Sequence, residues 1–313
     1  MKRVPDKVSG PILLALAAVI WGLTFIAQSE GDSVGGFTFQ AIRSILGFFT
    51  IAVYLLFRDR KIPKRHRKLP VWLRENKALL IAGCVCGVAL GAAMNLQQFG
   101  ILMQGQETST GRAGFITAIY IVLVPIIGIF RRKLPPVNAW LDVCIAAVGL
   151  YLISVPPGTA FGMSRADFLL LLGALGFALQ ITFIDVYVQK HDAVKLSAIQ
   201  FLVAAIFSAV LMAIFEKPTL TGIREAALPI VFAGVFSGGI AFTLQSVGQQ
   251  KCNPTLAALI MSMESVFTTI FDFLIRHNRL ELRELIGCAV VFTAVILAQL
   301  PFPAKRKKDE KNA

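Results

Sequence analysis

Pro11-Ile-Leu-Leu-Ala-Leu-Ala-Ala-Val-Ile-Trp-Gly-Leu-Thr-Phe-Ile26 is a stretch of sequence without a single charged residue. Runs of the same kind recur at 79–94, 113–130 and 196–215. A helix needs about 20 mainly apolar residues to cross a hydrocarbon core of about 30 Å. Of the 313 residues, 56% are hydrophobic and only 16% are charged, whereas a soluble domain carries about 25% charged residues. The chain is therefore predicted to cross a membrane many times.

Proline and glycine mark the connections between the apolar runs, because both residues interrupt helices. Examples are Gly35-Gly36, Pro135-Pro136 and Pro156-Pro157. These boundaries predict an all-α polytopic membrane protein with ten transmembrane helices. Their predicted ranges are 11–28, 36–57, 79–103, 112–130, 136–154, 167–187, 196–215, 226–248, 254–275 and 284–301.

The start of the chain has one alternative interpretation. Met1-Lys2-Arg3 followed by an apolar run resembles a secretory signal peptide. The apolar run continues past Trp21 to Ile26, however, and no polar mature sequence follows it. We therefore predict that this segment is an uncleaved first transmembrane helix.

Lysine and arginine gather on alternate connections between the predicted helices. If the amino terminus is cytoplasmic, 23 of them lie on the cytoplasmic side and 7 on the other side, and Arg43 lies within the second helix. Such an excess follows the positive-inside rule, so we expect both termini in the cytoplasm and the protein in the cell (inner) membrane. The net charge of +13 then reports topology rather than nucleic-acid binding. Docking of the 58–77 loop or the tail on anionic lipid is the alternative role.

The two halves of the chain resemble each other weakly at matching places. Residues 117–125 lead to Lys133-Leu-Pro135, and residues 257–265 lead to Arg279-Leu-Glu281. A five-helix unit that is repeated must insert upside down the second time, and such inverted repeats place a binding site near the midplane. The predicted organisation is a cytoplasmic amino terminus, two five-helix repeats and a basic cytoplasmic tail, at 1–10, 11–154, 167–301 and 302–313.

From about residue 11 to residue 301, the sequence resembles the EamA-type transporters of the drug/metabolite transporter superfamily. The likeness rests on the order and spacing of several short motifs. These are Trp21-Gly-Leu-Thr-Phe-Ile26, Arg43, Asn95-Leu-Gln-Gln98, Gly114-Phe-Ile-Thr117, Leu123-Val-Pro125, Ala241-Phe-Thr-Leu-Gln245, Gln249, Pro254-Thr-Leu-Ala-Ala-Leu-Ile260, Glu264-Ser265 and Glu284-Leu-Ile-Gly287.

This resemblance implies a central cavity lined by the first, third, fourth, sixth, eighth and ninth helices. It also implies a secondary transporter that exports amino-acid-like or nucleoside-like compounds by alternating access. The chain departs from the family pattern at Leu274-Ile-Arg-His-Asn278, where a Leu-Gly-Glu-type turn is common, and at Ser265, where proline is common. These departures bear on the packing of helix ends and on gating.

Glu264 is the strongest candidate for a functional residue. It is predicted to lie about 15 Å along the ninth helix from Pro254, at 1.5 Å per residue. An ionisable residue at such a depth is by default a functional-site hypothesis. It can bind the ammonium group of a substrate, or carry a proton as access alternates. The alternative is a hydrogen-bonded glutamate that only cross-links helices.

The other charged residues within the helices favour structural roles. Arg43 is expected to snorkel or to cap another helix, with binding of an anionic substrate as the alternative. Asp185 and Asp272 lie near helix ends, where solvation is expected. Asp142 lies in the first turns of the fifth helix, where a carboxylate compensates the helix dipole.

Uncharged polar and aromatic side chains supply further candidates for substrate contact. An amide offers both donors and acceptors to a neutral or zwitterionic ligand, although hydrogen bonding between helices explains glutamines equally well. Aromatic rings provide apolar or cation–π walls, and ordinary packing is the alternative. The substrate-contact candidates beside Glu264 are Trp21, Thr24, Gln28, Gln98, Tyr120, Gln180 and Gln245, with Phe25 and Phe183 as further wall residues.

Small residues and one proline are predicted to act structurally or in gating. Gly87-x-x-x-Gly91 in the third helix and Gly234-x-x-x-Gly238 in the eighth permit close approach of helices. We expect both to form packing seams that slide or bend during switching. Arg43, Gly91, Pro125 and Gly238 make up this structural set.

Three classes of function remain open from the sequence. No cofactor fingerprint, phosphate-binding loop or metal-ligand spacing is found, so no cofactor and no metal is predicted. The expected partners are a small-molecule substrate, a proton where flux is coupled, and the lipid bilayer, without nucleic acid. Of these three classes, a secondary transporter is the one that the sequence favours. An intramembrane enzyme that uses Glu264 and Asp185 as acid and base, and a non-transporting receptor or assembly subunit, are the alternatives.

Overall fold

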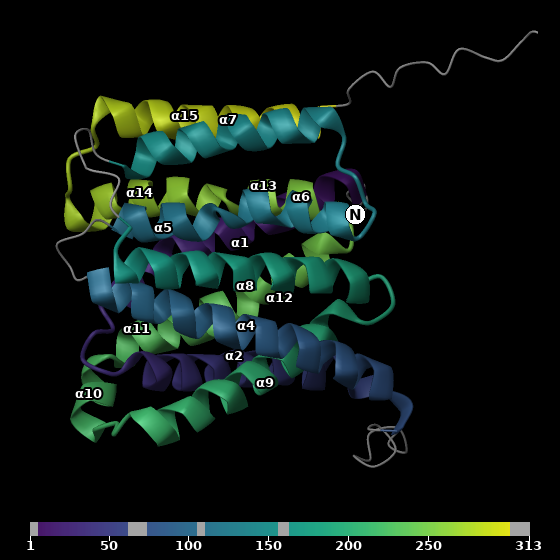
Figure 1. Cartoon of the computed structure of the whole chain (residues 1–313). Helices are drawn as coiled ribbons and strands as arrows, with labels where there is room; N and C mark the ends of the chain where they lie inside the picture. Colours follow the sequence, from purple (N-terminus) through teal and green to yellow (C-terminus); the bar gives the residue numbers. More distant parts are fainter. Residues whose placement is uncertain (1–5, 62–73, 105–109, 156–162, 301–313) are drawn as a thin grey trace, which may run out of the picture.

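The computed structural model describes residues 6–61, 74–104, 110–155 and 163–300. Within these residues, ten helices are long and apolar enough to cross a membrane (Figure 1). They span Val8–Ser29, Gly36–Arg58, Lys77–Met103, Arg112–Phe130, Val137–Ser154, Arg165–Tyr187, Ala193–Phe215, Ala227–Gln249, Pro254–Arg276 and Leu282–Gln299. The prediction of ten helices is confirmed, and each predicted end lies within three residues of the observed one. The basic tail and most of the basic loop after Arg58 lie outside the described residues.

The first half of the chain supplies five of these helices, and the fourth is interrupted at Ile119. Its elements are α1 (Asp6–Ser29), α2 (Gly36–Arg58), η1 (Asp59–Lys61), α4 (Lys77–Gln104), α5 (Thr110–Ala118), α6 (Tyr120–Phe130) and α7 (Val137–Ser154). In the part of the first half that the structure describes, no strand is present.

The second half repeats this order, with two interruptions. Its elements are α8 (Arg165–Tyr187), α9 (Ala193–Phe215), α10 (Leu220–Glu225), α11 (Ala227–Phe232), η3 (Ala233–Ala241), α12 (Phe242–Gln249), α13 (Pro254–Met261), α14 (Met263–Arg276) and α15 (Leu282–Gln299). The eighth spanning helix runs through α11, η3 and α12, and its middle part η3 is π-helical. The ninth is interrupted at Ser262, as the fourth is at Ile119.

Local sequence signals explain where several helices begin. Before α8, the hydroxyl of Ser164 accepts a hydrogen bond from the Asp167 amide, and the Asp167 carboxylate accepts one from the Ser164 amide. Before α13, the Asn253 side chain accepts from the Leu256 amide, and Pro254 follows at the first helical position. Such caps satisfy amides that have no partner within the helix.

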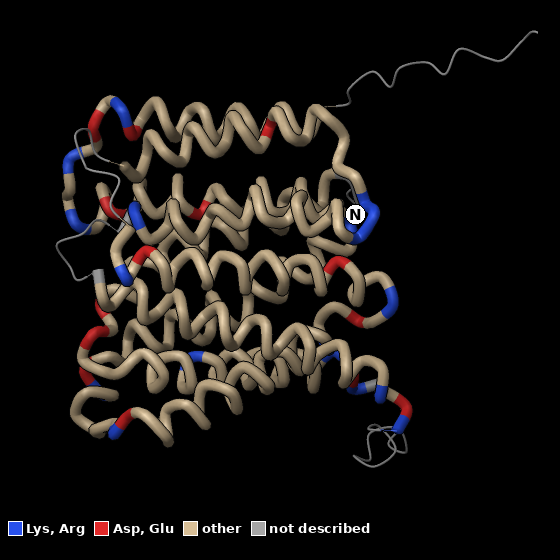
Figure 2. The backbone as a smooth tube through the Cα atoms, in the orientation of Figure 1, with Lys and Arg blue, Asp and Glu red and all other residues tan. Residues whose placement is uncertain are grey.

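Successive spanning helices run in opposite directions, so the bundle has two faces. We call the face where α1 begins and α15 ends the terminal face, and the other the distal face. Figure 2 shows lysine, arginine and acidic residues gathered at these two faces, with few charges between them. This distribution fits a bilayer core between the faces, because charges are costly at that depth.

Contacts between the helices relate the two halves by a pseudo-two-fold exchange. α4 packs against α8 and α9, and correspondingly η3 packs against α1 and α2. α2 packs against α9, and α7 packs along α15 (Figure 1). Exchanging the halves turns each of these contacts into itself or into another contact that is present, and matching helices run in opposite directions. The prediction of two inverted five-helix repeats is therefore confirmed.

Two glycine-containing seams occupy equivalent places in this arrangement. A Cβ atom on Gly87 of α4 would lie 2.6 Å from Val203 Cβ on α9. A Cβ atom on Gly234 of η3 would lie 2.6 Å from Leu46 Cβ on α2. Gly91 also faces α9, near Phe207, and Gly238 lies near Gly47 of α2 and Phe201 of α9. Only hydrogen at these positions allows the helices to approach so closely.

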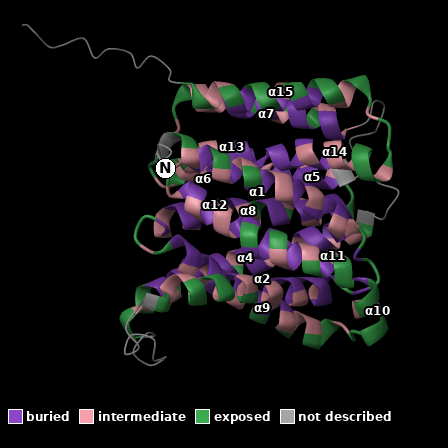
Figure 3. Cartoon of the chain, turned by 180° about the vertical axis from the view of Figure 1, so that it is seen from behind, coloured by how far each residue is buried: buried purple, intermediate pink, exposed green. Residues whose placement is uncertain are grey.

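Burial follows a pattern typical of a membrane protein. Large apolar side chains in the middle of spanning helices are exposed on the outside of the bundle, for example Val148, Ile206 and Phe292. Many polar side chains are buried between the helices instead, including Gln40, Gln98 and Gln200, each 0% exposed. Figure 3 shows buried residues along the inner sides of the helices and exposed residues along the outer helices.

Candidate functional site

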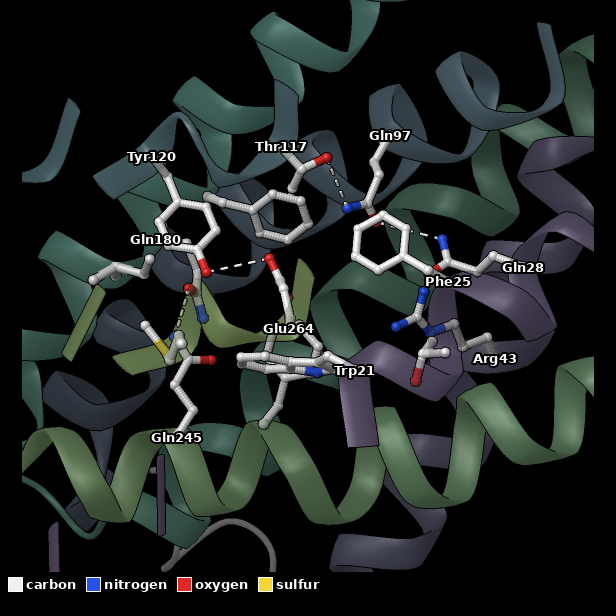
Figure 4. Close-up of a pocket in the computed structure, with 15 residues that line it drawn as sticks. Trp21, Phe25, Gln28, Arg43, Gln97, Thr117, Tyr120, Gln180, Gln245 and Glu264 are labelled. Atoms are coloured by element: carbon white, nitrogen blue, oxygen red, sulfur yellow. Dashed lines mark hydrogen bonds between the residues drawn. The ribbon is translucent and has the colours of Figure 1, made fainter. Parts of the chain in front are cut away.

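A cavity lies between the helices, and both halves of the chain line it (Figure 4). The first half contributes Trp21, Thr24, Phe25, Gln28, Arg43, Gln97, Thr117 and Tyr120. The second contributes Phe177, Gln180, Ile181, Phe242, Gln245, Met261 and Glu264. Its volume is about 40 Å³, enough for about three water molecules. The protein is thus in a compact state, and a molecule much larger than water fits only if the cavity widens.

α1 forms one wall of this cavity. Trp21, Thr24, Phe25 and Gln28 follow the spacing of three and four residues that places side chains on one face of a helix. The ring of Trp21 meets that of Phe242 edge-on, with centroids 4.9 Å apart. The indole Nε1 of Trp21 has no hydrogen-bond partner among the residues that the structure describes. It is therefore a donor that a ligand in the cavity can use.

Glu264 lies in the first turn of α14, directly after the interruption at Ser262. Only 5% of its surface is exposed. Tyr120 directly follows the interruption at Ile119, and its hydroxyl donates to Glu264 Oε1 over 3.2 Å. Figure 4 shows the two groups meeting in the cavity. Among the described residues, no cation pairs with Glu264.

Arg43 brings a positive charge to the same cavity from α2. It is 2% exposed, which contradicts the expectation that it snorkels to the surface. Its Nε donates to the Ala233 carbonyl over 3.3 Å, Nη2 to Ser237 Oγ over 2.7 Å and Nη1 to Gln40 Oε1 over 3.4 Å. All three acceptors are uncharged, and the described residues place no carboxylate within ion-pair distance. Figure 4 shows Arg43 and Tyr120 on opposite sides of Glu264.

Glutamines form two clusters in equivalent helices. Gln28 of α1 donates to Gln98 of α4 over 2.9 Å, and Gln40 of α2 donates to the same oxygen over 3.2 Å. In the other half, Gln245 of α12 donates to Gln180 of α8 over 3.2 Å, and Gln180 donates to Gln200 of α9 over 3.3 Å. In Figure 4, Gln28 and Gln180 lie on opposite sides of the cavity.

The structure brings together most of the residues selected from the sequence. Of the eight substrate-contact candidates, Gln98 alone does not line the cavity, since Gln97 takes that place and Gln98 pairs behind it. Phe183 also lies outside the cavity lining, whereas Arg43, expected to be structural, is part of it. Gly91 and Gly238 lie in the two seams, and Pro125 is buried within α6. The lining thus includes the second helix, which the resemblance did not imply.

Sequence reasoning missed several wall residues. Thr117, Phe177, Ile181, Phe242 and Met261 line the cavity without having been selected as candidates. One signal points to Phe177, because Phe25-x-x-Gln28 recurs as Phe177-x-x-Gln180. The others are apolar or small residues within apolar helices, where nothing in the local sequence separates a wall from a packing contact.

Two further expectations concerned acidic residues. Asp185 was expected to be solvated, but it is 6% exposed and lies 3.1 Å from Lys133 Nζ. It does not line the cavity. Asp142 near the start of α7 is 2% exposed, and its Oδ2 has no hydrogen-bond partner in the described part of the chain.

Comparison with known proteins identifies relatives along nearly the whole chain. The model of the EamA-like transporter family matches residues 8–155 and 164–300. An uncharacterized transporter of Archaeoglobus fulgidus is 28% identical over 92% of this chain and 84% of its own length. A chloroplastic WAT1-related protein of Arabidopsis thaliana is 20% identical over 90% of this chain and 67% of its own length.

A solved crystal structure supports the fold. It superposes with a TM-score of 0.72 and 18% sequence identity, over 93% of this chain and 98% of its own. Likeness at this level of identity concerns the fold alone. The family match covers both five-helix halves, and residues of both halves line the cavity. The chain belongs to the EamA-like transporter family, within the drug/metabolite transporter superfamily.

Proposed function

We propose that the protein is a secondary transporter that exports small zwitterionic metabolites, of the amino-acid-like kind, by alternating access through the cavity. One observation carries the proposal. Glu264 and Arg43 are both buried at the cavity, and in the described part of the chain neither has a partner of opposite charge. A solute with an ammonium group and a carboxylate group complements both.

Electrostatics favour this arrangement. A charge buried in the membrane is costly unless it is paired. Glu264 accepts one hydrogen bond from Tyr120 and Arg43 donates to neutral oxygens, which lowers the cost without neutralising either charge. A bound zwitterion places its ammonium group near Glu264 and its carboxylate near Arg43. Charge-assisted hydrogen bonds of this kind are about twice as strong as neutral ones.

Nucleoside-like compounds are the second substrate class. They would be recognised by amides and stacked on rings such as Trp21. The glutamines that would do this already pair with one another, as Gln28 does with Gln98 and Gln245 with Gln180. The two unpaired charges favour the zwitterionic class.

The alternative of an intramembrane enzyme, with Glu264 and Asp185 as acid and base, requires these two carboxylates to lie close together. Asp185 is held by Lys133 and lies away from the cavity that Glu264 lines. The family match and the transporter-named relative also point to a transporter.

Orientation in the membrane belongs to the same proposal. The excess of 23 to 7 lysines and arginines supports placing the terminal face in the cytoplasm. We place the protein in the cell membrane, so that export runs from the terminal face to the distal face.

Purified protein in liposomes tests the proposed function. We expect saturable, gradient-dependent flux of neutral α-amino acids, and slower flux of amines and carboxylic acids of the same size that lack one of the two charges. Product formation without flux would support an enzyme instead. Equal flux of all three solute classes would contradict the assignment of a zwitterionic substrate.

The seams give a separate prediction. Gly91→Leu and Gly238→Leu are expected to abolish flux while membrane insertion is retained, because added side chains push α4 from α9 and η3 from α2. A Cβ atom at Gly238 would already lie 3.3 Å from the Cα atom of Gly47 of α2 and 3.0 Å from the ring of Phe201 of α9. Gly114→Ala is the matched control, since its added carbon meets Ser265 Oγ at 3.4 Å, an ordinary contact. Normal flux in both leucine variants would show that the seams do not take part in switching.

A further inference from the structure

Two helix ends on opposite faces of the bundle are built alike. α6 ends at Phe130 on the terminal face and is followed by Arg131 and by Arg132, whose φ is 56°. α14 ends at Arg276 on the distal face and is followed by His277, whose φ is also 56°. Among the described residues, these are the two non-glycine residues with positive φ. A residue in the left-handed conformation is a common way to end a helix. Here such a residue follows the fourth spanning helix of one repeat and its equivalent, the ninth, in the other.

An ion pair accompanies the helix end on the terminal face. Lys133 Nζ lies 3.1 Å and Arg131 Nη1 3.6 Å from Asp185 Oδ2. Arg131 Nη1 also donates to the Thr182 carbonyl over 3.4 Å. Asp185 and Thr182 belong to the last turns of α8, so these contacts join the end of α6 to the end of α8. We call them the terminal latch.

The distal face carries the equivalent pair. Arg276 Nη2 donates to Glu30 Oε1 over 2.5 Å and to Ser29 Oγ over 2.7 Å. These contacts join the end of α14 to the end of α1, and we call them the distal latch. Exchange of the two halves turns α6 into α14 and α8 into α1. The two latches are therefore related by the same pseudo-two-fold exchange as the helix contacts.

Each latch joins two helices that line the cavity. On the terminal side, Tyr120 of α6 and Ile181 of α8 are wall residues, and the latch lies further along the same two helices. On the distal side, the wall residues are Glu264 of α14 and Gln28 of α1, and Glu30 follows Gln28 by two residues. A solute that leaves between either pair of helices must pass the latch on that face.

Both latches are formed in the described structure, and the cavity between them has a volume of about 40 Å³. We propose that the terminal latch and the distal latch are opposed gates of the transporter, and that opening of the cavity to one face breaks the latch on that face alone. This inference rests on the proposed function for its role in transport. It explains the departure of residues 274–278 from the family pattern, because Arg276 there supplies the cation of the distal latch.

The two latches differ in exposure. The Asp185 side chain is 7% exposed and has two cationic partners, whereas the Glu30 side chain is 51% exposed and has one. Water screens the distal pair more strongly. We therefore expect the distal face to open more readily than the terminal face when no solute is bound.

Side-specific labelling of the cavity tests the latches. Thr24→Cys places a thiol in the cavity wall, and a membrane-impermeant maleimide is added to oriented vesicles from one face at a time. The chain without Thr24→Cys gives the background from the native cysteines. In the Thr24→Cys chain, Glu30→Gln is expected to raise the rate of labelling from the distal face about fivefold. Loss of an exposed ion pair that contributes about 1 kcal/mol shifts the equilibrium towards the open state by this factor. Asp185→Asn is expected to raise labelling from the terminal face.

Two further variants keep this test informative. Where Asp185→Asn fails to insert, Lys133→Gln takes its place, because the Lys133 side chain is 60% exposed. Lys195→Gln is the matched control: it removes the ion pair of Lys195 with Asp59, whose atoms lie 3.2 Å apart near the ends of α9 and α2. That pair does not join two helices at the cavity wall, so labelling is expected to stay unchanged from either face.

The outcomes separate the latches from the proposed function, because labelling needs no transported solute. Face-selective increases support the latches even if no flux is found, and absence of flux then counts against the transporter alone. Labelling that does not change, or that rises equally from both faces, overturns the latches even if flux is normal.

Discussion

Glu264→Gln is expected to lower solute flux by about 10- to 100-fold, since a hydrogen bond to a charged group contributes about 1.5–3 kcal/mol. The amide keeps the size of the side chain but carries no charge to bind an ammonium group and no titrating proton. Flux in the variant is therefore also expected to lose its dependence on pH. Both quantities are measured as initial rates in liposomes over a range of pH.

Tyr120→Phe is the matched control for this variant. It removes the hydroxyl that donates to Glu264 over 3.2 Å and leaves the carboxylate in place. If Glu264 acts on the solute, Tyr120→Phe changes the rate much less than Glu264→Gln and retains the dependence on pH. If Glu264 only cross-links helices through Tyr120, the two variants behave alike. An unchanged pH profile in Glu264→Gln would count against proton carriage.

Arg43→Gln is expected to lower flux of amino acids by a similar factor, about 10- to 100-fold. Flux of amines of the same size, which lack the carboxylate, is expected to change little. The reason is that Arg43 supplies the positive charge of the cavity wall, whereas its present partners are neutral. The ratio of the two fluxes in one preparation measures this change in selectivity and is independent of the amount of protein inserted.

Ser237→Ala distinguishes a binding role of Arg43 from a packing role. It removes the acceptor of Arg43 Nη2, at 2.7 Å, and keeps the guanidinium. A structural role for Arg43 predicts similar losses for Ser237→Ala and Arg43→Gln, with both solutes affected alike. The proposed site predicts that Ser237→Ala leaves the ratio of fluxes unchanged.

The architecture was predictable from the sequence because its physical causes are local. Apolar length fixes where a helix can cross a membrane, and prolines such as Pro254 fix where one begins. The position of Glu264 within the ninth helix followed from counting residues along that helix. Its burial could be expected as well, since the middle of a spanning helix has no access to bulk water.

What the sequence left open depends on contacts between distant segments. Arg43 is held by Ala233 and Ser237, about 190 residues later in the chain. Asp185 was expected to be solvated, because its partner Lys133 lies about 50 residues earlier, in the connection between α6 and α7. Gln97 and Gln98 are neighbours in one helix, and only the packing of α4 decides which of them reaches the cavity.

Counterflow in liposomes tests alternating access through the cavity most directly. Vesicles that contain the protein are loaded with unlabelled neutral α-amino acids, and entry of the same compounds in radiolabelled form is followed. In a transporter whose site faces one side at a time, the site must turn back to the outside after it releases solute inside. This reorientation is faster when the site carries solute, so unlabelled solute inside the vesicle is predicted to accelerate entry of the labelled solute. Entry that is independent of internal solute and rises linearly with external concentration would contradict alternating access.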